Sequence, residues 1–440
     1  MMIIIAFAVF LAVIMGCVFT GQNLLWGLWL GIVLFSAIAL RRGHTFKDIC
    51  AMAWKKGRTA LIVIPVLLII GMVTGLWRSS GTIAYFLYYG LKSITPTWFV
   101  LMAFLLSATL SFALGTAFGV ASTAGVVLIT IARSGGVDLL VTAGAVVSGA
   151  FWGDRCSPMS SCAALVAACT GSKLYSNIRE MLRTCIIPTV LTVIFYAAVS
   201  LSHPITVVDP QVLAALSGGF DLHFVVLIPA IVMLLLPLAR IPIKIAMAAS
   251  AFIALIISLT VQDVSVGDAL YYAVMGYTPE GELASILSGG GIVSMVKACT
   301  IVMSTSLLAG ILEGIDALGG MTAYLGKLSG RIGLYPTYIL VSIFTAMCFC
   351  NQSVVIVMGE QLMGSHYRRL GVSPTTHAMD IANSGVLIAG LVPWSIAVAI
   401  PLAMMNVTSG AILWAAYLYI VPIFYLFTRR FFLPGQTERA

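Results

Sequence analysis

The segment 153–161, GDRCSPMSS, places an acid, a base, a proline and several hydroxyl side chains directly after the apolar run VVSGAFW. Carboxylate and hydroxyl oxygen atoms bind small hard cations, and a carboxylate can also carry a proton. We therefore expect Asp154 to bind a cation or a proton, with Ser157 and Ser160 as oxygen ligands. An ionisable side chain in apolar sequence is energetically expensive and is read first as functional. The plainer alternative is an ordinary turn in which Asp154 caps the next helix.

Two further polar interruptions have the same character. GTAFGVASTAG at 115–125 offers Thr116 and freed carbonyl groups as ligands, because glycine costs a helix interior about 1 kcal/mol. Its alternative is close helix packing through small residues. DIANSGVLIAGLVPWS at 380–395 offers Asn383 and Ser384, which we pair with Gly153–Arg155, and Pro393-Trp394 resembles another helix break.

Three acids outside the first interruption are candidates for a proton path. Asp380 is the only acid in its stretch, Glu313 lies in LLAGILEGIDALGGM, and Glu360 lies in VVIVMGEQLMGSHYRR. Each is expected either to carry protons or, in the plainer alternative, to end its helix at the membrane interface.

The elements that must position these residues occur twice in the chain. Residues 67–86 and 306–325 match at an offset of 239 positions. The identical pairs are Gly71 with Gly310, Gly75 with Gly314, Gly81 with Gly320, Ala84 with Ala323 and Tyr85 with Tyr324. Paired, interrupted hydrophobic segments in two halves are typical of secondary transporters, whose site lies at the breaks.

Composition places the chain in a membrane. It is 61% apolar and 9% charged over 440 residues, with a mean hydropathy of +1.09. We expect about ten to thirteen crossings of roughly 20 residues each. The fold should be all-α, because backbone groups in lipid must be satisfied internally. The N-terminal run MMIIIAFAVFLAVIMG has no basic residue before it and is interpreted as the first membrane helix rather than a signal peptide.

The distribution of charge predicts the orientation. Basic residues expected in the cytoplasm are Arg41, Arg42, Lys47, Lys55, Lys56, Arg58, Arg240, Lys244, Arg429, Arg430 and Arg439. Acids expected outside are Asp209, Asp221, Asp263, Asp268, Glu280 and Glu282. Both termini are then cytoplasmic and the repeat copies run in opposite directions. We divide the chain into a first inverted half (1–201), an exterior linker (202–221), a second half (222–428) and a cytoplasmic tail (429–440).

Several function classes find no support in the sequence. No GxxxxGK[ST] loop is present, which argues against ATP-driven transport by this chain. The histidines lack the spacing of a metalloenzyme, the nine cysteines read as packing residues, and neither an enzyme nor a cofactor is expected. The net charge of +8 reflects the basic loops and does not indicate a nucleic-acid partner.

At these motifs the chain resembles the NhaC-type sodium/proton antiporter family, within the broader ion-transporter superfamily. The matching pieces are 115–125, 153–165, 306–318 and 350–395. The resemblance implies an exchanger in the inner (plasma) membrane, two inverted repeats with broken helices or re-entrant hairpins, and a homodimer surrounded by lipid.

The chain departs from the family pattern at three acids. The pattern SP-L-S-D-T-T has Ser161 in place of its aspartate, and E-D-S-G-T has Ala382 and Asn383 in place of both acids. Our leading interpretation is Na+/H+ antiport by alternating access, centred on Asp154. The alternative is an exchanger or symporter of a small organic acid or amino acid coupled to H+ or Na+, because relatives of this family also carry such solutes. Arg155 would then contact the anionic solute.

Overall fold

The computed structural model describes residues 2–20, 22–93, 96–158, 160–202, 210–239, 241–279, 283–317 and 321–432. These residues form helices joined by short loops and contain no strand beyond an isolated bridge between Tyr277 and Gly289. The chain is an all-α, multi-pass membrane protein, as predicted. Some residues used in the sequence argument lie outside the described ranges, namely Asp209, Arg240, Glu280, Glu282, Gly320 and Arg439.

Within the described residues, four helices are long and apolar enough to cross a membrane: Leu24–Arg41, Ala117–Ser134, Leu174–Ser202 and Ile292–Gly314. Two bent pairs pass the same test together. They are Ile64–Ser79 with Thr82–Tyr89, bent by 64°, and Pro374–Leu391 with Ile396–Met404, bent by 52°. Six shorter apolar helices accompany them. The total of about ten to thirteen crossings therefore stays a prediction.

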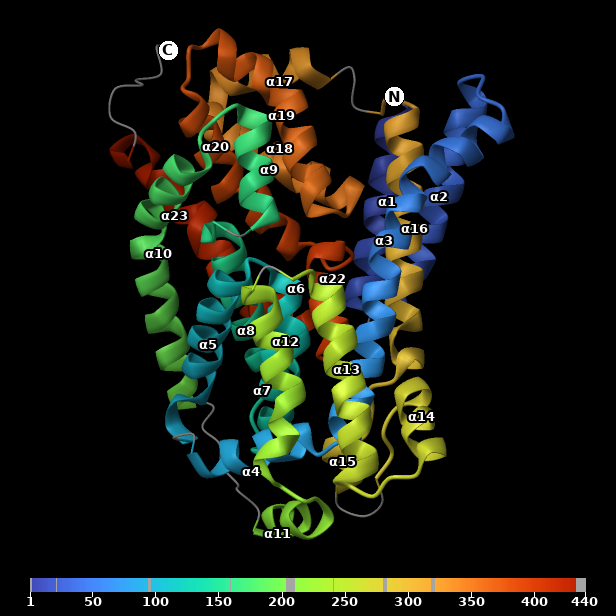
Figure 1. Ribbon diagram of the computed structural model, residues 1–440. Coiled ribbons are helices and arrows are strands. Elements are labelled where there is room, and N and C mark those ends of the chain that lie inside the picture. Colours follow the sequence, from blue (N-terminus) through green and yellow to red (C-terminus); the bar gives the residue numbers. More distant parts are fainter. Residues whose placement is uncertain are drawn as a thin grey trace.

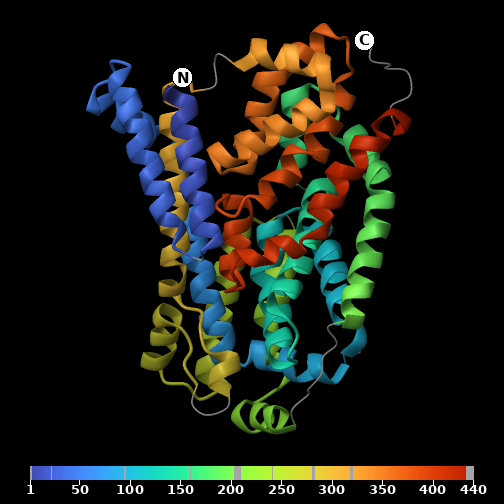
Figure 2. The ribbon, with the colours of Figure 1, turned by 180° about the vertical axis from the view of Figure 1, so that it is seen from behind.

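One side of the molecule is a bundle of α1 (Met2–Phe19), α2 (Leu24–Arg41), α3 (Phe46–Ser79) and α16 (Val296–Gly314), as Figures 1 and 2 show. Glycines bring α3 close to α16 and the loop before it. A Cβ at Gly71 would lie 2.5 Å from the Gly291 carbonyl oxygen, and one at Gly310 would lie 2.4 Å from the Met52 carbonyl oxygen. Small residues permit this approach between membrane helices.

Two helices on the other side end at the middle of the molecule. Helix α5 (Phe99–Leu114) lies in the lower half of Figure 1 and α18 (Leu334–Phe349) in the upper half. Each ends at a residue in the left-handed conformation, Gly115 with φ 67° and Cys350 with φ 56°. The chain then turns into α6 (Ala117–Val120), the π-helical turn η2 (Ala121–Gly125) and α7 (Val126–Ser134), or into α19 (Gln352–Arg369).

Two broken helices meet these turns. Helix α8 (Leu139–Cys156) is followed by α9 (Ser161–Thr170) across a break at Pro158. In the second half α20 (Pro374–Asn383), α21 (Gly385–Ile388) and η6 (Ala389–Leu391) precede a break at Pro393, after which α22 (Ile396–Met404) begins. Proline cannot continue a helix, and the following Ser160 and Ser395 cap the next one.

The element boundaries correct the pairing of the two interruptions. Phe99 and Leu334 begin α5 and α18, Asp138 and Ser373 cap α8 and α20, and Ser160 and Ser395 cap α9 and α22. Each pair is 235 positions apart. This spacing matches the break at Pro158 with the one at Pro393, so the expected match of Gly153–Arg155 with Asn383–Gly385 was wrong. The prediction relied on the polar pair Asn383-Ser384, but the break in the structure lies at Pro393, two residues before the Ser395 cap.

The remaining boundaries also refine the sequence picture. Helix α11 (Pro210–Gly219) lies within the expected linker, and α23 (Ala416–Phe432) continues into the expected tail. The turn after α12 (Ile228–Leu238), expected at the cytoplasmic end, lies near mid-height in Figure 1. The reason is length, because 11 residues at about 1.5 Å each cannot cross a bilayer core. The start of α1 and the end of α23 lie toward the upper end of Figure 1, with α11 at the other.

Candidate functional site

Asp154 lies in the last turn of α8, 5% exposed, and faces the start of α9. The Ser160 hydroxyl donates a hydrogen bond to Asp154 Oδ1 over 3.0 Å. The same hydroxyl oxygen accepts from the backbone N–H groups of Cys162 and Ala163, at 3.1 and 3.3 Å. The Ser160 hydroxyl therefore links the first backbone N–H groups of α9 to the Asp154 carboxylate.

The turn between α18 and α19 approaches the same break. Cys162 Sγ lies 3.1 Å from Gln352 Oε1, and Gln352 Nε2 donates to the Val386 carbonyl oxygen over 2.9 Å. Gln352 therefore connects the start of α9 to α21. Sequence reasoning assigned no site role to Gln352 and interpreted Cys162 only as a packing residue. The sequence signal that could have identified Gln352 is its polar side chain at the start of a helix.

The two breaks are also tied to the ends of α5 and α18. Ser157 Oγ donates to the Phe112 carbonyl oxygen over 2.7 Å, and Trp394 Nε1 donates to the Met347 carbonyl oxygen over 2.9 Å. Phe112 and Met347 occupy matching positions, 235 residues apart. Ser157, an expected ligand, thus donates its hydroxyl proton to a backbone carbonyl group.

Arg155 is fully buried and joins α8 to three other helices. Its partners are Thr184 and Met181 of α10 (Leu174–Ser202), Ala382 and Asn383 of α20, Tyr417 of α23, and the adjacent Cys156. Its hydrogen-bond partners among the described residues are all uncharged. The guanidinium thus contacts both positions where the family pattern has acids, Ala382 and Asn383.

The other expected oxygen ligands lie in separate surroundings. Asn383 is fully buried, its side-chain oxygen accepts from Arg155, and its amide nitrogen has no partner in the described part of the chain. Ser384 Oγ donates to the Asp380 carbonyl oxygen over 2.5 Å. Thr116 is half-buried and caps α6 through a 3.5 Å contact from the Gly119 N–H. Of the expected oxygen ligands, Ser160 is the one that hydrogen-bonds Asp154 directly within the described ranges.

Asp380 is completely buried and ion-paired. Arg429 Nη2 lies 2.9 Å from Asp380 Oδ2, Arg429 Nε lies 3.0 Å from Oδ1, and the Tyr367 hydroxyl donates to Oδ2 over 2.7 Å. Arg429, expected in a cytoplasmic tail, is therefore part of α23 and fixes that helix against α20. Sequence reasoning missed this pair because its members are 49 residues apart.

Glu313 and Glu360 form partly exposed ion pairs. Glu313 pairs with Lys56 over 2.7 Å, and the two side chains are 34% and 29% exposed. Glu360 pairs with Arg368 over 2.8 Å, with 20% of the glutamate side chain exposed. Neither contact joins these acids to Asp154, and their role in a proton path stays a prediction.

The described residues hold no cluster of three or more His, Cys, Asp or Glu side chains suited to a metal ion. A transported cation at Asp154 would thus depend on hydroxyl, amide and carbonyl oxygen atoms for its remaining ligands. Such neutral oxygen ligands suit a hard monovalent ion held briefly rather than a resident metal.

Comparison with known families decides the assignment. The model of the Na+/H+ antiporter family matches residues 1–173 and 153–429. The chain belongs to the Na+/H+ antiporter family. This result confirms the resemblance seen in the sequence motifs.

Three relatives show how the family is represented. An uncharacterized Na(+)/H(+) antiporter of Haemophilus influenzae is 28% identical over 377 residues, 82% of this chain and 80% of that protein. A malate-2H(+)/Na(+)-lactate antiporter of Bacillus subtilis is 27% identical over 402 residues, 89% and 86% of the two chains. The Na(+)/H(+) antiporter NhaC of Alkalihalophilus pseudofirmus is 28% identical over 339 residues, 75% and 73%. All three are transporters.

Proposed function

We propose that the protein is a secondary active transporter that exchanges a monovalent cation, Na+ in the first instance, for H+ by alternating access. Family membership supports the class of transport. The observation that carries the site is the buried carboxylate of Asp154 at the Pro158 break, bonded to Ser160 at the start of α9. A single carboxylate can hold either a proton or a cation, so competition at Asp154 couples the two fluxes.

The residues around Asp154 have different parts in this proposal. Ser160 holds the carboxylate, and Ser157 and Gln352 place further side-chain oxygen atoms at the same break. Arg155 is a positioning residue, because each of its three nitrogen atoms already donates to protein acceptors. A solute carboxylate would have to displace these bonds, which disfavours Arg155 as the contact in the organic-acid alternative.

The division into two inverted halves remains part of the proposal. Its support is the constant spacing of 235 positions for the α5, α8 and α9 boundaries, together with the contacts of α3 and α16. Gly71 meets Gly291, and Gly310 meets Met52. An offset of 239 carries Gly71 to Gly310 and Met52 to Gly291, so one contact maps onto the other, as a pseudo-two-fold axis requires.

We further propose a plasma-membrane location with both termini cytoplasmic, and a homodimer built on the opening helix pairs of the two halves. The positive-inside rule supports the orientation, since the basic segment 41–58 lies at the same end of the molecule as both termini. Helix α11 and α14 (Val266–Met275), which carries Asp268, lie toward the opposite end.

The test uses vesicles that contain the purified protein and an interior pH dye. An imposed sodium gradient should change the interior pH with wild-type protein and leave it at the level of empty vesicles with Asp154→Asn. Asp138→Asn is the matched control, because Asp138 caps the start of the same helix and is exposed. Folded wild-type protein that responds to none of sodium, lithium or potassium would overturn cation exchange and direct the assay to malate and lactate.

A further inference from the structure

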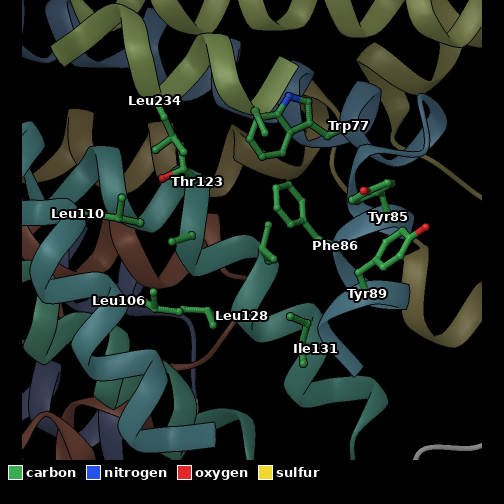
Figure 3. A pocket seen from close by; sticks show the side chains of 13 residues that line it. Trp77, Tyr85, Phe86, Tyr89, Leu106, Leu110, Thr123, Leu128, Ile131 and Leu234 are labelled. Atoms are coloured by element: carbon green, nitrogen blue, oxygen red, sulfur yellow. The ribbon is translucent and has the colours of Figure 1, made fainter. Parts of the chain in front are cut away.

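An apolar cavity of about 450 Å³ opens between α4 (Thr82–Ser93), α5, α7 and α12. Figure 3 shows aliphatic and aromatic side chains from these helices surrounding a shared space. Residues that define its walls include Trp77, Phe86, Leu106, Leu110, Leu128 and Leu234. The lining is almost entirely hydrocarbon, so the chemistry that fits it is an alkyl chain.

A second, polar pocket of about 470 Å³ adjoins the first, and Tyr89 lines both. Asp221 and His223 are its ionisable residues. Asp221 is exposed, and no cation in the described part of the chain forms an ion pair with it. His223 Nδ1 accepts from the Val225 N–H at 3.4 Å, so Nε2 carries the ring proton and can donate outward.

The position of α4 defines the depth of the two pockets in the membrane. Helix α4 leaves α3 at an angle of 64° and lies at the end of the molecule opposite the termini (Figure 1). It carries Tyr85, Tyr88 and Tyr89. Tyrosines gather where hydrocarbon meets headgroups, so the apolar cavity faces acyl chains and the polar pocket faces headgroups.

We propose that this double pocket is a binding site for a phospholipid with an amine headgroup, of the phosphatidylethanolamine type. One acyl chain occupies the apolar cavity, the ammonium group pairs with Asp221, and the phosphate accepts from His223. An anionic lipid without an amine would meet the Asp221 carboxylate with nothing to neutralise it. A choline headgroup carries a positive charge but has no N–H to donate to that carboxylate, so the site favours a primary ammonium.

The bound acyl chain would lie against η2, which packs against the end of the second broken helix. Thr123 and Ala124 of this π-helical turn line the cavity. On its other side Gly125 packs against Met405 at the end of α22, where an added Cβ would lie 3.1 Å from the Met405 sulfur. Single π-helical turns within helices often mark functional positions. The lipid would therefore contact η2, the turn whose other side packs against α22 of the second broken helix.

The experiment measures thermal unfolding of the full chain in detergent after addition of phosphatidylethanolamine, phosphatidylcholine or phosphatidylglycerol with identical acyl chains. A ligand of the native state raises the unfolding midpoint in proportion to its affinity. We expect the largest rise with phosphatidylethanolamine. Leu106→Trp, on the cavity wall and 43% exposed, should abolish that rise, whereas Leu105→Trp, 38% exposed and outside the cavity, should retain it.

The headgroup has its own pair of variants. Asp221→Asn should reduce the midpoint shift with phosphatidylethanolamine to that seen with phosphatidylcholine. Asp263→Asn, at another exposed acid of the loops expected on that side, should leave it unchanged. Equal shifts with all three lipids, equal behaviour of the two tryptophan variants, or an Asp221→Asn protein that still prefers phosphatidylethanolamine would each overturn the proposal.

Discussion

The break at Pro158 and the break at Pro393 are each followed by a serine that caps the next helix, Ser160 for α9 and Ser395 for α22. Four residues before Pro158 lies Asp154, and four residues before Pro393 lies Ala389, which is fully buried. The same Pro-x-Ser break with a serine cap therefore forms with and without a carboxylate. We infer that proline and serine make the break, and we propose that a single side chain, Asp154, gives the first break its capacity to bind a cation.

The surroundings of the two breaks differ as well. At the first, Asp154 has a hydroxyl partner but no ion pair among the described residues. At the second, the nearby acid Asp380 is neutralised by Arg429, and Asn383 takes a hydrogen bond from Arg155. We infer that the first break carries the exchange chemistry and the second is a charge-balanced support. The predictions below test this division.

The largest effect on stability is expected at Arg155. Arg155→Gln leaves several buried acceptors without donors, and the free energy of unfolding should fall by about 3–5 kcal/mol. Asn383→Asp, which supplies the carboxylate of the family pattern, should raise the thermal midpoint because it pairs with the guanidinium. Arg179→Gln, at an exposed position of α10, is the control for loss of one positive charge. A midpoint unchanged in Arg155→Gln would contradict the supporting role.

A comparable loss is expected at Asp380. Asp380→Asn leaves the Arg429 guanidinium with no anionic partner in that pair, at a cost of about 3–5 kcal/mol. The double variant with Arg429→Gln should lose less than the sum of the two single variants, because it removes both charges. Asp154→Asn should abolish exchange without lowering the thermal midpoint. If both aspartate variants lose stability equally, the division between the two breaks is wrong.

A smaller effect separates the two capping serines. Ser160→Ala and Ser395→Ala should each cost about 1 kcal/mol of stability through the lost N-cap. Only Ser160→Ala should raise the sodium concentration at half-maximal exchange, by about tenfold if the bond to Asp154 is worth about 1.4 kcal/mol. Thermal unfolding measures the stability of both variants, and sodium titration of the vesicle pH signal measures the half-maximal sodium concentration of each. A matching change in Ser395→Ala would place cation binding at both breaks.

The smallest effects are expected for Glu313→Gln and Glu360→Gln. Exposed ion pairs contribute about 0–1 kcal/mol, so both variants should unfold near the wild-type midpoint. Exchange rates in vesicles should stay within about twofold, since neither acid contacts Asp154. Loss of exchange in a folded Glu313→Gln or Glu360→Gln protein would extend the proton path to that residue, as the sequence suggests.

Much of the architecture could be predicted from the sequence. The apolar composition indicates a helical membrane protein. Gly115, Pro158 and Ser160 each end or begin a helix through interactions with residues close by in the sequence, so their effects can be predicted from the sequence. The pairing of the interruptions failed because a polar dipeptide, Asn383-Ser384, was weighted above the Pro-x-Ser pattern. The predicted start of the cytoplasmic tail at residue 429 was wrong. The positive charge of Arg429 suggested a solvent-exposed residue, whereas Arg429 lies in α23 and pairs with Asp380 of α20.

The sequence by itself determined that this protein spans a membrane, where its helices break and to which family it belongs, because these properties follow from local chemistry and motif identity. Tertiary structure decided which charges are free. Arg155 meets Asn383 across 228 positions and Asp380 meets Arg429 across 49, while Asp154 has no ion pair within the described residues and accepts a hydrogen bond from the Ser160 hydroxyl. Only packing brings such distant groups into contact, and in a low-dielectric interior those contacts decide whether a charged side chain supports the fold or remains available to an ion.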